Sequence, residues 1–535
     1  MAVLRPDPSH AEAGSTDPSA GVSASSTRAE TTIAAAGDAS VIAEALLVAE
    51  GKADSTETMY PGAESDRPGW HVRLFGTHEF FRLWLVQVVS AMGDWLGFSA
   101  VILLAARIGG GDGAGAISLV MAARIIPGFF FGPLAGVLVD RWDRKRVMVV
   151  CDVGRACVIA TLPFVGTLWG LVAASLVLEV FTLLWSPAKD ATVPKLVPQE
   201  QLTSANSLSL GAAYGTFPFA ALAFALLAGI SERLSSIEAL SVLRLDQMSL
   251  ALYVDVLTFL FSALMIRSLA VPGRPSRTGS SGERRADLAK TFHELKEGWH
   301  YIFLNHTVRA VNIGLATGLI GGGMLIPLGA VFSTEVLGAG AAGYGLFTTA
   351  LGFGVATGAV VVSLLQKRLP KAQVFTTALF LTGASLFAGT SATSLAVALG
   401  AVFLMGVFVG PVYVMGFVLL QEEVSDELRG RVFSSLNTLV RLCVLIAMIA
   451  GPLLAAALGR LSDSLLGGSI ELGSLTVALP GVRLALWLAA VIVIAAGFLA
   501  LHSLRSGQRL RAAREARHPS RHDLSAPAGV PPTKA

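Results

Sequence analysis

Five charged side chains lie inside long apolar stretches of this sequence, where a charge is costly and therefore informative. They are Asp94, Arg124, Glu179, Asp255 and Arg441. In lipid a carboxyl group can exist charged or protonated, because the loss of hydration disfavours the charge. Asp94, which lies near the middle of the first stretch, Glu179 and Asp255 are therefore candidates to carry protons. The alternative is a fixed ion pair, for example of Asp94 with Arg124 or Arg441.

A second charged group follows the second apolar stretch. The run from Asp140 to Arg146 reads Asp-Arg-Trp-Asp-Arg-Lys-Arg and comes shortly after Gly136. Asp140 would be a carboxylate at a helix end among cations, while the basic residues could simply anchor a loop on the cytoplasmic side. Asp152 and Arg155 lie one helical turn apart, so they could pair with each other or join this group.

These residues sit in a strongly apolar chain. Of its 535 residues, 53% are hydrophobic and only 14% are charged, and the mean hydropathy is +0.65. A soluble domain carries about 25% charged residues. Apolar stretches of about 20 residues are long enough to cross a bilayer, and helices satisfy every backbone polar group inside lipid. The expected spans are 83–108, 115–139, 146–164, 166–186, 205–229, 249–269, 308–332, 342–365, 372–390, 393–420, 432–458 and 480–504.

The fold class predicted from this pattern is an all-α membrane protein with twelve transmembrane helices in two six-helix pseudo-repeats. The halves resemble one another, because Gly132 and Gly136 recur in spacing as Gly354 and Gly358, each pair before a basic loop. Transporters built from such repeats place their binding site between the halves.

Alternate loops differ in their basic residues, which sets the orientation. The loop at 109–115 has none. The loops of the other set are basic at Arg141 to Arg146, Lys189 and Lys195, 274–296, Lys367 to Lys371, and Arg429 and Arg431. Positive loops stay in the cytoplasm. We therefore expect a multi-pass protein of the cell (cytoplasmic) membrane with both termini cytoplasmic.

The expected domains follow from this topology. Residues 1–70 are too polar to bury a core and are predicted to form a disordered cytoplasmic tail that is not a signal peptide. The segment 271–307 is predicted to be a cytoplasmic linker with an amphipathic helix. The two membrane halves are 75–270 and 308–505, and 506–535 is predicted to be a cytoplasmic C-terminal tail.

The loop after the second span resembles the signature of the major facilitator superfamily, although Asp143 replaces the second glycine of that signature. The segments Ser186-Pro187-Ala188 and Arg429-Gly430-Arg431 resemble its drug-exporter branch, which contains macrolide and siderophore efflux proteins. In each half the family's first and fourth helices line the central cavity, and the third and sixth face lipid. The resemblance therefore implies that Asp94 and Glu179, rather than Asp255, carry the protons. The resemblance also implies a cytoplasmic gate, to which we assign Gly136, Asp140, Arg141, Arg144, Asp152 and Arg155.

Other classes of function have no support in the residue patterns. The sequence has no phosphate-binding Gly-x-x-x-x-Gly-Lys-Ser/Thr, zinc-binding His-Glu-x-x-His or nucleophilic Gly-x-Ser-x-Gly motif, so we expect no enzyme, no cofactor and no metal site. The three cysteines show no paired spacing. The net charge of +3 does not indicate nucleic-acid binding.

The sequence therefore predicts a secondary active transporter that exports a small, largely apolar organic compound, a drug or natural product, by alternating access coupled to protons. Asp94, Glu179, Arg124 and Arg441 would line its coupling and substrate cavity. Its partners would be the substrate, protons and membrane lipids, and it would function as a monomer. The alternatives are a lipid or lysolipid mover on the same scaffold and a non-transporting receptor or scaffold. The substrate itself is not encoded in any recognisable pattern.

Overall fold

The computed structural model describes residues 75–139, 142–235, 246, 248–270, 301–467, 469–472, 475–478 and 480–517. Nearly all of them are helical. The long helices of the first half are α3 (His78–Gly109), α4 (Gly113–Val139), α5 (Arg144–Thr161), α6 (Leu168–Asp190), α8 (Leu202–Gly215), α9 (Phe217–Leu234) and α10 (Ser249–Ser268). Those of the second half are α12 (His306–Gly323), α13 (Leu325–Val331), α14 (Gly340–Leu365), α15 (Lys371–Ser391), α16 (Leu395–Glu423), α17 (Asp426–Leu466) and α18 (Gly481–Arg517).

The helices supply twelve spans. By length and composition, eleven segments of the described chain could cross a membrane, and the first, His78–Gly128, is 51 residues long. A helix of that length would measure about 77 Å, whereas the hydrocarbon core is about 30 Å thick. The segment instead turns back at Gly110, whose φ of +53° breaks the helix between α3 and α4. It therefore holds two spans, and the predicted number of twelve is confirmed.

Two spans are each made of two shorter helices. In the fifth, α8 ends at Gly215 and α9 begins at Phe217, one residue before Pro218. In the seventh, α12 ends in Gly321-Gly322-Gly323, and α13 begins two residues before Pro327. Glycine weakens a helix and proline cannot continue its hydrogen-bond ladder, so both breaks follow from the local sequence.

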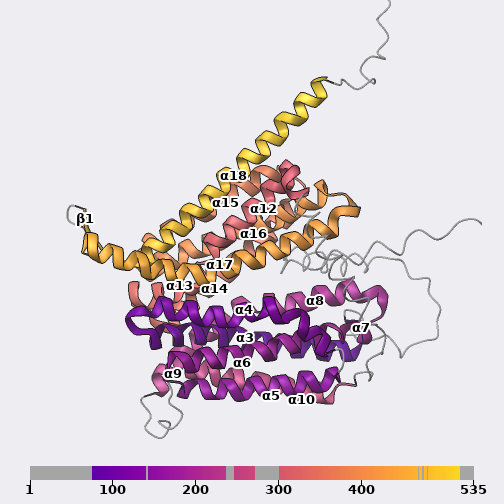
Figure 1. Cartoon of the computed structure of the whole chain (residues 1–535), viewed down its shortest axis with the longest axis vertical. Coiled ribbons are helices and arrows are strands. Elements are labelled where there is room, and N and C mark those ends of the chain that lie inside the picture. Colours follow the sequence, from indigo (N-terminus) through magenta and orange to yellow (C-terminus); the bar gives the residue numbers. More distant parts are fainter. Residues whose placement is uncertain are drawn as a thin grey trace, which may run out of the picture.

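The chain folds into two six-span bundles, one from α3 to α10 and one from α12 to α18 (Figure 1). At one end of the molecule a single buried core includes residues of both halves, such as Val120, Phe224, Tyr344 and Ala447. At the other end each half has a core of its own. The bundles are therefore joined at the end near 109–113 and separate toward the end that carries the basic loops.

The junction is made by α4 with α17 and by α9 with α14. Ser118 Oγ donates a hydrogen bond to the carbonyl oxygen of Ile449 at 2.7 Å. On α14, a Cβ built at Gly345 would lie 2.7 Å from the backbone nitrogen of Ala225 on α9. Glycine at this position therefore lets the two halves approach to backbone contact.

Asp246, at the joined end of the molecule, shows how the loop before α10 is held. Burial by itself would raise the pKa of Asp246, but hydrogen bonds from the Ser249 hydroxyl and from the backbone N–H groups of Met248 and Ser249, together with Arg107, hold it below its usual range. The ion pair with Arg107 links this loop to the end of α3.

The structure differs from the sequence predictions in two places. The loop after α17 contains a two-stranded antiparallel hairpin, β1 (Ser469–Leu472) and β2 (Leu475–Ala478), which was not predicted. α18 continues to Arg517, beyond the expected span end at 504. The residues after 504 are mostly Arg, Ala and Leu, which favour helix, and the first proline is Pro519. The segments 1–70 and 271–300, expected to be a tail and most of the linker, lie outside the described residues.

Candidate transport site

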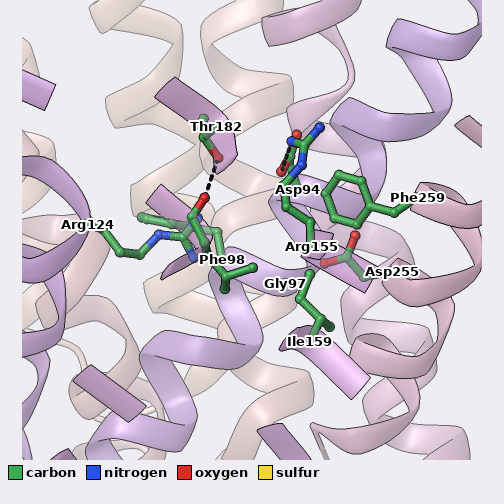
Figure 2. Close-up of a pocket in the computed structure, with 10 residues that line it drawn as sticks. Asp94, Gly97, Phe98, Arg124, Arg155, Ile159, Thr182, Asp255 and Phe259 are labelled. Atoms are coloured by element: carbon green, nitrogen blue, oxygen red, sulfur yellow. Dashed lines mark hydrogen bonds and ion pairs between the residues drawn. The ribbon is translucent and has the colours of Figure 1, made fainter. Parts of the chain in front are cut away.

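Asp94 and Arg155 form the centre of a pocket inside the first bundle. Asp94 comes from α3 and Arg155 from α5, and Arg155 Nη1 lies 3.7 Å from Asp94 Oδ1 (Figure 2). Their environments differ, because 45% of the Asp94 side chain is accessible but only 3% of the Arg155 side chain. The other lining residues are Gly97, Phe98, Arg124, Ile159, Leu178, Thr182, Asp255 and Phe259. An accessible carboxylate thus faces a buried cation.

Arg155 is also held by partners other than Asp94. Its Nη2 donates to Asp152 Oδ1, one turn earlier on α5, and this pair is fully buried. The other oxygen of Asp152 accepts a hydrogen bond of 2.6 Å from Ser262 on α10. The guanidinium carbon of Arg155 lies 4.2 Å from the ring centre of Phe259 and 5.1 Å from that of Trp185. The ring faces stabilise the positive charge.

The predicted pairing of Asp152 with Arg155 is therefore present. Arg155 also lines the pocket beside Asp94, a contact that sequence reasoning did not anticipate. The gate role expected for Asp152 and Arg155 stays a prediction.

Asp255, on α10, lines the same pocket and lies against α3. Its side chain is buried, with 1% relative exposure, and packs against Gly93 and Gly97 of α3. A Cβ added at either glycine would collide with a carboxylate oxygen of Asp255. The absence of side chains at these two positions therefore creates the space that the carboxyl group occupies.

Arg124 and Glu179 lie toward α4 and α6. Arg124 lines the pocket, and its guanidinium carbon is 5.7 Å from the ring centre of Phe98. Glu179 interacts electrostatically with both Arg124 and Asp94. Of the four residues predicted for the cavity, Asp94 and Arg124 line this pocket, and Glu179 and Arg441 do not. Arg441 lies on α17 in the other bundle and is exposed.

An aromatic surface adjoins Asp94. The Trp95 ring makes edge-on contacts with Phe98 and Phe217, with ring centres 5.9 and 4.8 Å apart. Trp95 Nε1 donates to the carbonyl oxygen of Ala213 at 3.0 Å. This hydrogen bond fixes the indole against the break between α8 and α9, so the apolar surface is held in place beside the ionisable group.

The residues predicted for the gate are only partly described. Asp140 and Arg141 lie outside the described residues, and Gly136 is within α4. Arg144 begins α5 and donates to the carbonyl oxygen of Ala191, which caps α6, at 3.4 Å. Lys145 donates to the carbonyl oxygen of Leu269, which caps α10, at 2.7 Å. Cations at helix C-termini are favourable, so these two residues brace the ends of helices in their own half.

Sequence reasoning gave little weight to the contributions of the third and sixth spans. The family resemblance implied that these spans face lipid, and their outer faces are indeed apolar and exposed at Val150, Leu257 and Leu264. Their inner faces carry Asp152, Arg155 and Asp255, all buried against α3 or each other. The spacing Gly93-x-x-x-Gly97 was the available signal, since it marks a helix face that another element can approach closely.

Comparison with known proteins agrees with the two-bundle architecture. Residues 74–237 match the family described as transmembrane secretion effector, and residues 311–532 match the Major Facilitator Superfamily. The two matched regions lie in opposite bundles. The chain belongs to the major facilitator superfamily.

Relatives of this major facilitator protein include named exporters. It is 24% identical to macrolide efflux protein A of Streptococcus pyogenes, over 73% of this chain and 93% of the relative. It is 26% identical to the putative bacilysin exporter BacE of Bacillus amyloliquefaciens, over 67% and 84% of the two chains. It is also 26% identical to the uncharacterised transporter YfiS of Bacillus subtilis, over 70% and 86%.

Solved structures share the fold. A bacterial homologue of the human lysosomal transporter Spinster superposes with a TM-score of 0.63 at 14% identity, over 81% of this chain and 98% of the other. The nucleoside transporter NupG superposes with a TM-score of 0.56 at 12% identity, over 80% and 99%. The family match and the named relatives, rather than these likenesses of fold, make the protein a transporter with relatives of the efflux type.

Proposed function

We propose that this transporter exports a small, largely apolar organic compound in exchange for protons, and that Asp94 is the proton carrier. The observation that supports this most directly is the pair of Asp94 with Arg155, in which the carboxylate is accessible and the guanidinium is buried. Asp94 can take up a proton without leaving a buried cation unpaired, because Arg155 keeps its contact with Asp152.

The exchange follows from differential binding. A ligand shifts a conformational equilibrium only by its different affinity for the two states. A proton on Asp94 removes the attraction to Arg155 and weakens the contact between α3 and α5. A substrate lying against Trp95 and Phe98 would instead favour the charged form of Asp94 if it carries a positive group. Proton and substrate would then favour opposite states, which is the requirement for exchange.

The aromatic surface beside Asp94 supports an apolar substrate. Trp95, Phe98 and Phe217 present ring faces and edges beside the charged groups of the pocket. Two relatives, a macrolide efflux protein and a putative bacilysin exporter, support export rather than uptake. Glu179 and Arg124 are the second candidate pair for the proton, and Arg441 would contribute from the opposite bundle.

The remaining assignments rest on the orientation set by basic loops. The separated end of the bundles carries Arg144 and Lys145, so we place this end, both termini and the linker in the cytoplasm of a cell membrane. The bundles are then open to the cytoplasm and closed outside. Gly136, Asp140, Arg141 and Arg144 would form the gate that closes the cytoplasmic end in the opposite state. The transporter would work as a monomer.

Transport in vesicles tests the function. The purified protein is reconstituted, a pH gradient is imposed, and uphill movement of a compound panel is measured with and without the gradient. The panel includes a macrolide, a lipophilic cation and a lysophospholipid. Gradient-driven movement of an organic compound, lost in Asp94→Asn, supports the proposal. Movement of the lysophospholipid alone would favour a lipid mover, and gradient-independent movement in every case would refute proton exchange.

A further inference from the structure

Asp255 is the buried carboxyl group that the transport cycle described above does not use. It is enclosed by α3, and its only side-chain hydrogen bond in the described part of the chain is from Thr258 Oγ to Oδ1, at 3.2 Å. That hydroxyl is also 2.8 Å from the backbone oxygen of Asp255, and one hydroxyl hydrogen cannot serve both acceptors fully. The carboxyl group is therefore poorly compensated as an anion.

The cations near Asp255 are already engaged by other acidic groups. Asp94 faces it from α3, and Asp152 and Arg155 belong to α5, while Arg124 on α4 lies further across the pocket. Arg155 is already shared between Asp152 and Asp94, and Arg124 lies over Phe98 and close to Glu179. Among the described residues, no cation forms an ion pair with Asp255.

A third carboxylate without its own cation is unfavourable in this interior. An unpaired buried charge commonly becomes neutral by binding a proton, because protonation costs less than an uncompensated ion. Like charges in one site reinforce this effect, because ionising two neighbouring carboxyl groups costs more free energy than ionising one of them. Asp94 and Asp255 line the same pocket, and Asp255 packs against the bare backbone of Gly97, one helical turn after Asp94 on α3.

We propose that Asp255 is a second proton-binding site, which holds a proton while Asp94 is ionised and paired with Arg155. The step it performs is transfer of that proton from a carboxyl oxygen of Asp255 to the carboxylate of Asp94, through the pocket that both residues line. Asp255 becomes ionised and Asp94 neutral, so the total charge is unchanged. Arg155, released by Asp94, then faces the newly ionised group. This inference rests on the proposed role of Asp94 but concerns a different residue.

Infrared difference spectroscopy tests the protonation directly, without a transport assay. The full chain is reconstituted in lipid nanodiscs at neutral pH, and the carbonyl band of protonated carboxyl groups is recorded before and after exchange into D₂O. We expect one such band, with the D₂O shift of a protonated carboxyl group. It should be lost in Asp255→Asn and kept in Asp94→Asn. The exposed Asp112 supplies the control, since Asp112→Asn should leave the band unchanged.

Thr258→Val keeps the test valid if Asp255→Asn does not fold. Valine removes the hydrogen bond to Oδ1 while keeping a similar shape, so the band should persist and move to higher frequency. A wild-type spectrum without a protonated carboxyl band, or a band unaffected by both variants, would overturn the proposal. The proposed role of Asp94 is tested separately: if Asp94→Asn retains full uphill export, Asp94 is not the carrier, whatever the infrared result shows for Asp255.

A transport measurement then asks whether the stored proton is used. In vesicles, the proton-to-substrate ratio is obtained from the pH gradient that just balances a known substrate gradient. Asp255→Asn should lower this ratio while substrate still moves downhill. An unchanged ratio, with an intact infrared assignment, would show that Asp255 binds a proton that does not take part in exchange and would overturn the transfer step.

Discussion

Arg155 Nη1 lies 3.7 Å from Asp94 Oδ1 across the contact between α3 and α5, and the acidic member of this ion pair is accessible. The other acidic partner of Arg155, Asp152, is completely buried and is further held by Ser262. One guanidinium therefore has a permanent partner and an exchangeable one. Protonation can break the second contact without disturbing the first.

Asp94→Asn should abolish export driven by a pH gradient while leaving substrate binding and downhill movement measurable. The amide keeps the shape of the carboxyl group but cannot bind and release a proton. Uphill export in vesicles gives the first quantity, and binding to the detergent-purified protein gives the second. Glu179→Gln is the matched comparison, because Glu179 is the other predicted carrier. If both variants retain full uphill export, neither residue is an essential carrier.

Arg155→Gln should destabilise the protein strongly. It leaves Asp152 buried without a cation, and removal of one partner of a buried pair costs about 3–5 kcal/mol. Thermal unfolding in detergent measures the effect. Arg460→Gln is the control, since Arg460 is exposed on α17 and its described hydrogen bond is to a carbonyl oxygen of its own helix. Equal stability of the two variants would show that the pair with Asp152 contributes little.

Gly345→Ala should weaken the junction between the bundles. The new methyl group would lie 2.7 Å from the backbone nitrogen of Ala225, and overpacking of this kind costs about 1–3 kcal/mol. The cost falls on the state in which this end is closed. A cysteine placed at Ser118, within the junction, should therefore react faster with a thiol reagent. Gly229→Ala is the control, because a Cβ at Gly229 meets nothing within 4 Å.

The orientation is tested by labelling from outside the cell. A cysteine replacing Asp112, between α3 and α4, should react with a membrane-impermeant reagent, because this loop lacks basic residues. A cysteine at position 280, in the basic linker, should react only after the membrane is permeabilised. The reverse pattern would overturn the assignment of the separated end to the cytoplasm.

Asp140→Asn should slow transport and shift the protein toward the state open at the basic-loop end. The substitution keeps the size of the side chain and removes the charge that, by family resemblance, closes the cytoplasmic gate. Turnover in vesicles should fall more than substrate affinity does. Transport that is unchanged over a range of pH would show that Asp140 has no gate function.

Composition and loop charges were sufficient to predict the twelve spans and their division into halves. An apolar run of about 20 residues has few folded alternatives in lipid, so length and hydropathy determine the element. The helix breaks before Pro218 and Pro327 also lie in the local sequence, although they were not predicted. The run of helix-forming residues up to Arg517 likewise explains why α18 extends past its expected end.

The arrangement of the charged residues was decided by tertiary structure. The sequence by itself determined that Asp94, Glu179, Arg124 and Asp255 lie at membrane depth, because their neighbours are apolar. It could not determine that Arg155, rather than Arg124 or Arg441, would pair with Asp94, since that depends on how α5 is rotated against α3. Pairing between helices depends on how they pack. Gly93 and Gly97 have no side chains, so Asp255 can pack against α3. The buried contact with Asp152 holds Arg155 in a position from which it also contacts Asp94.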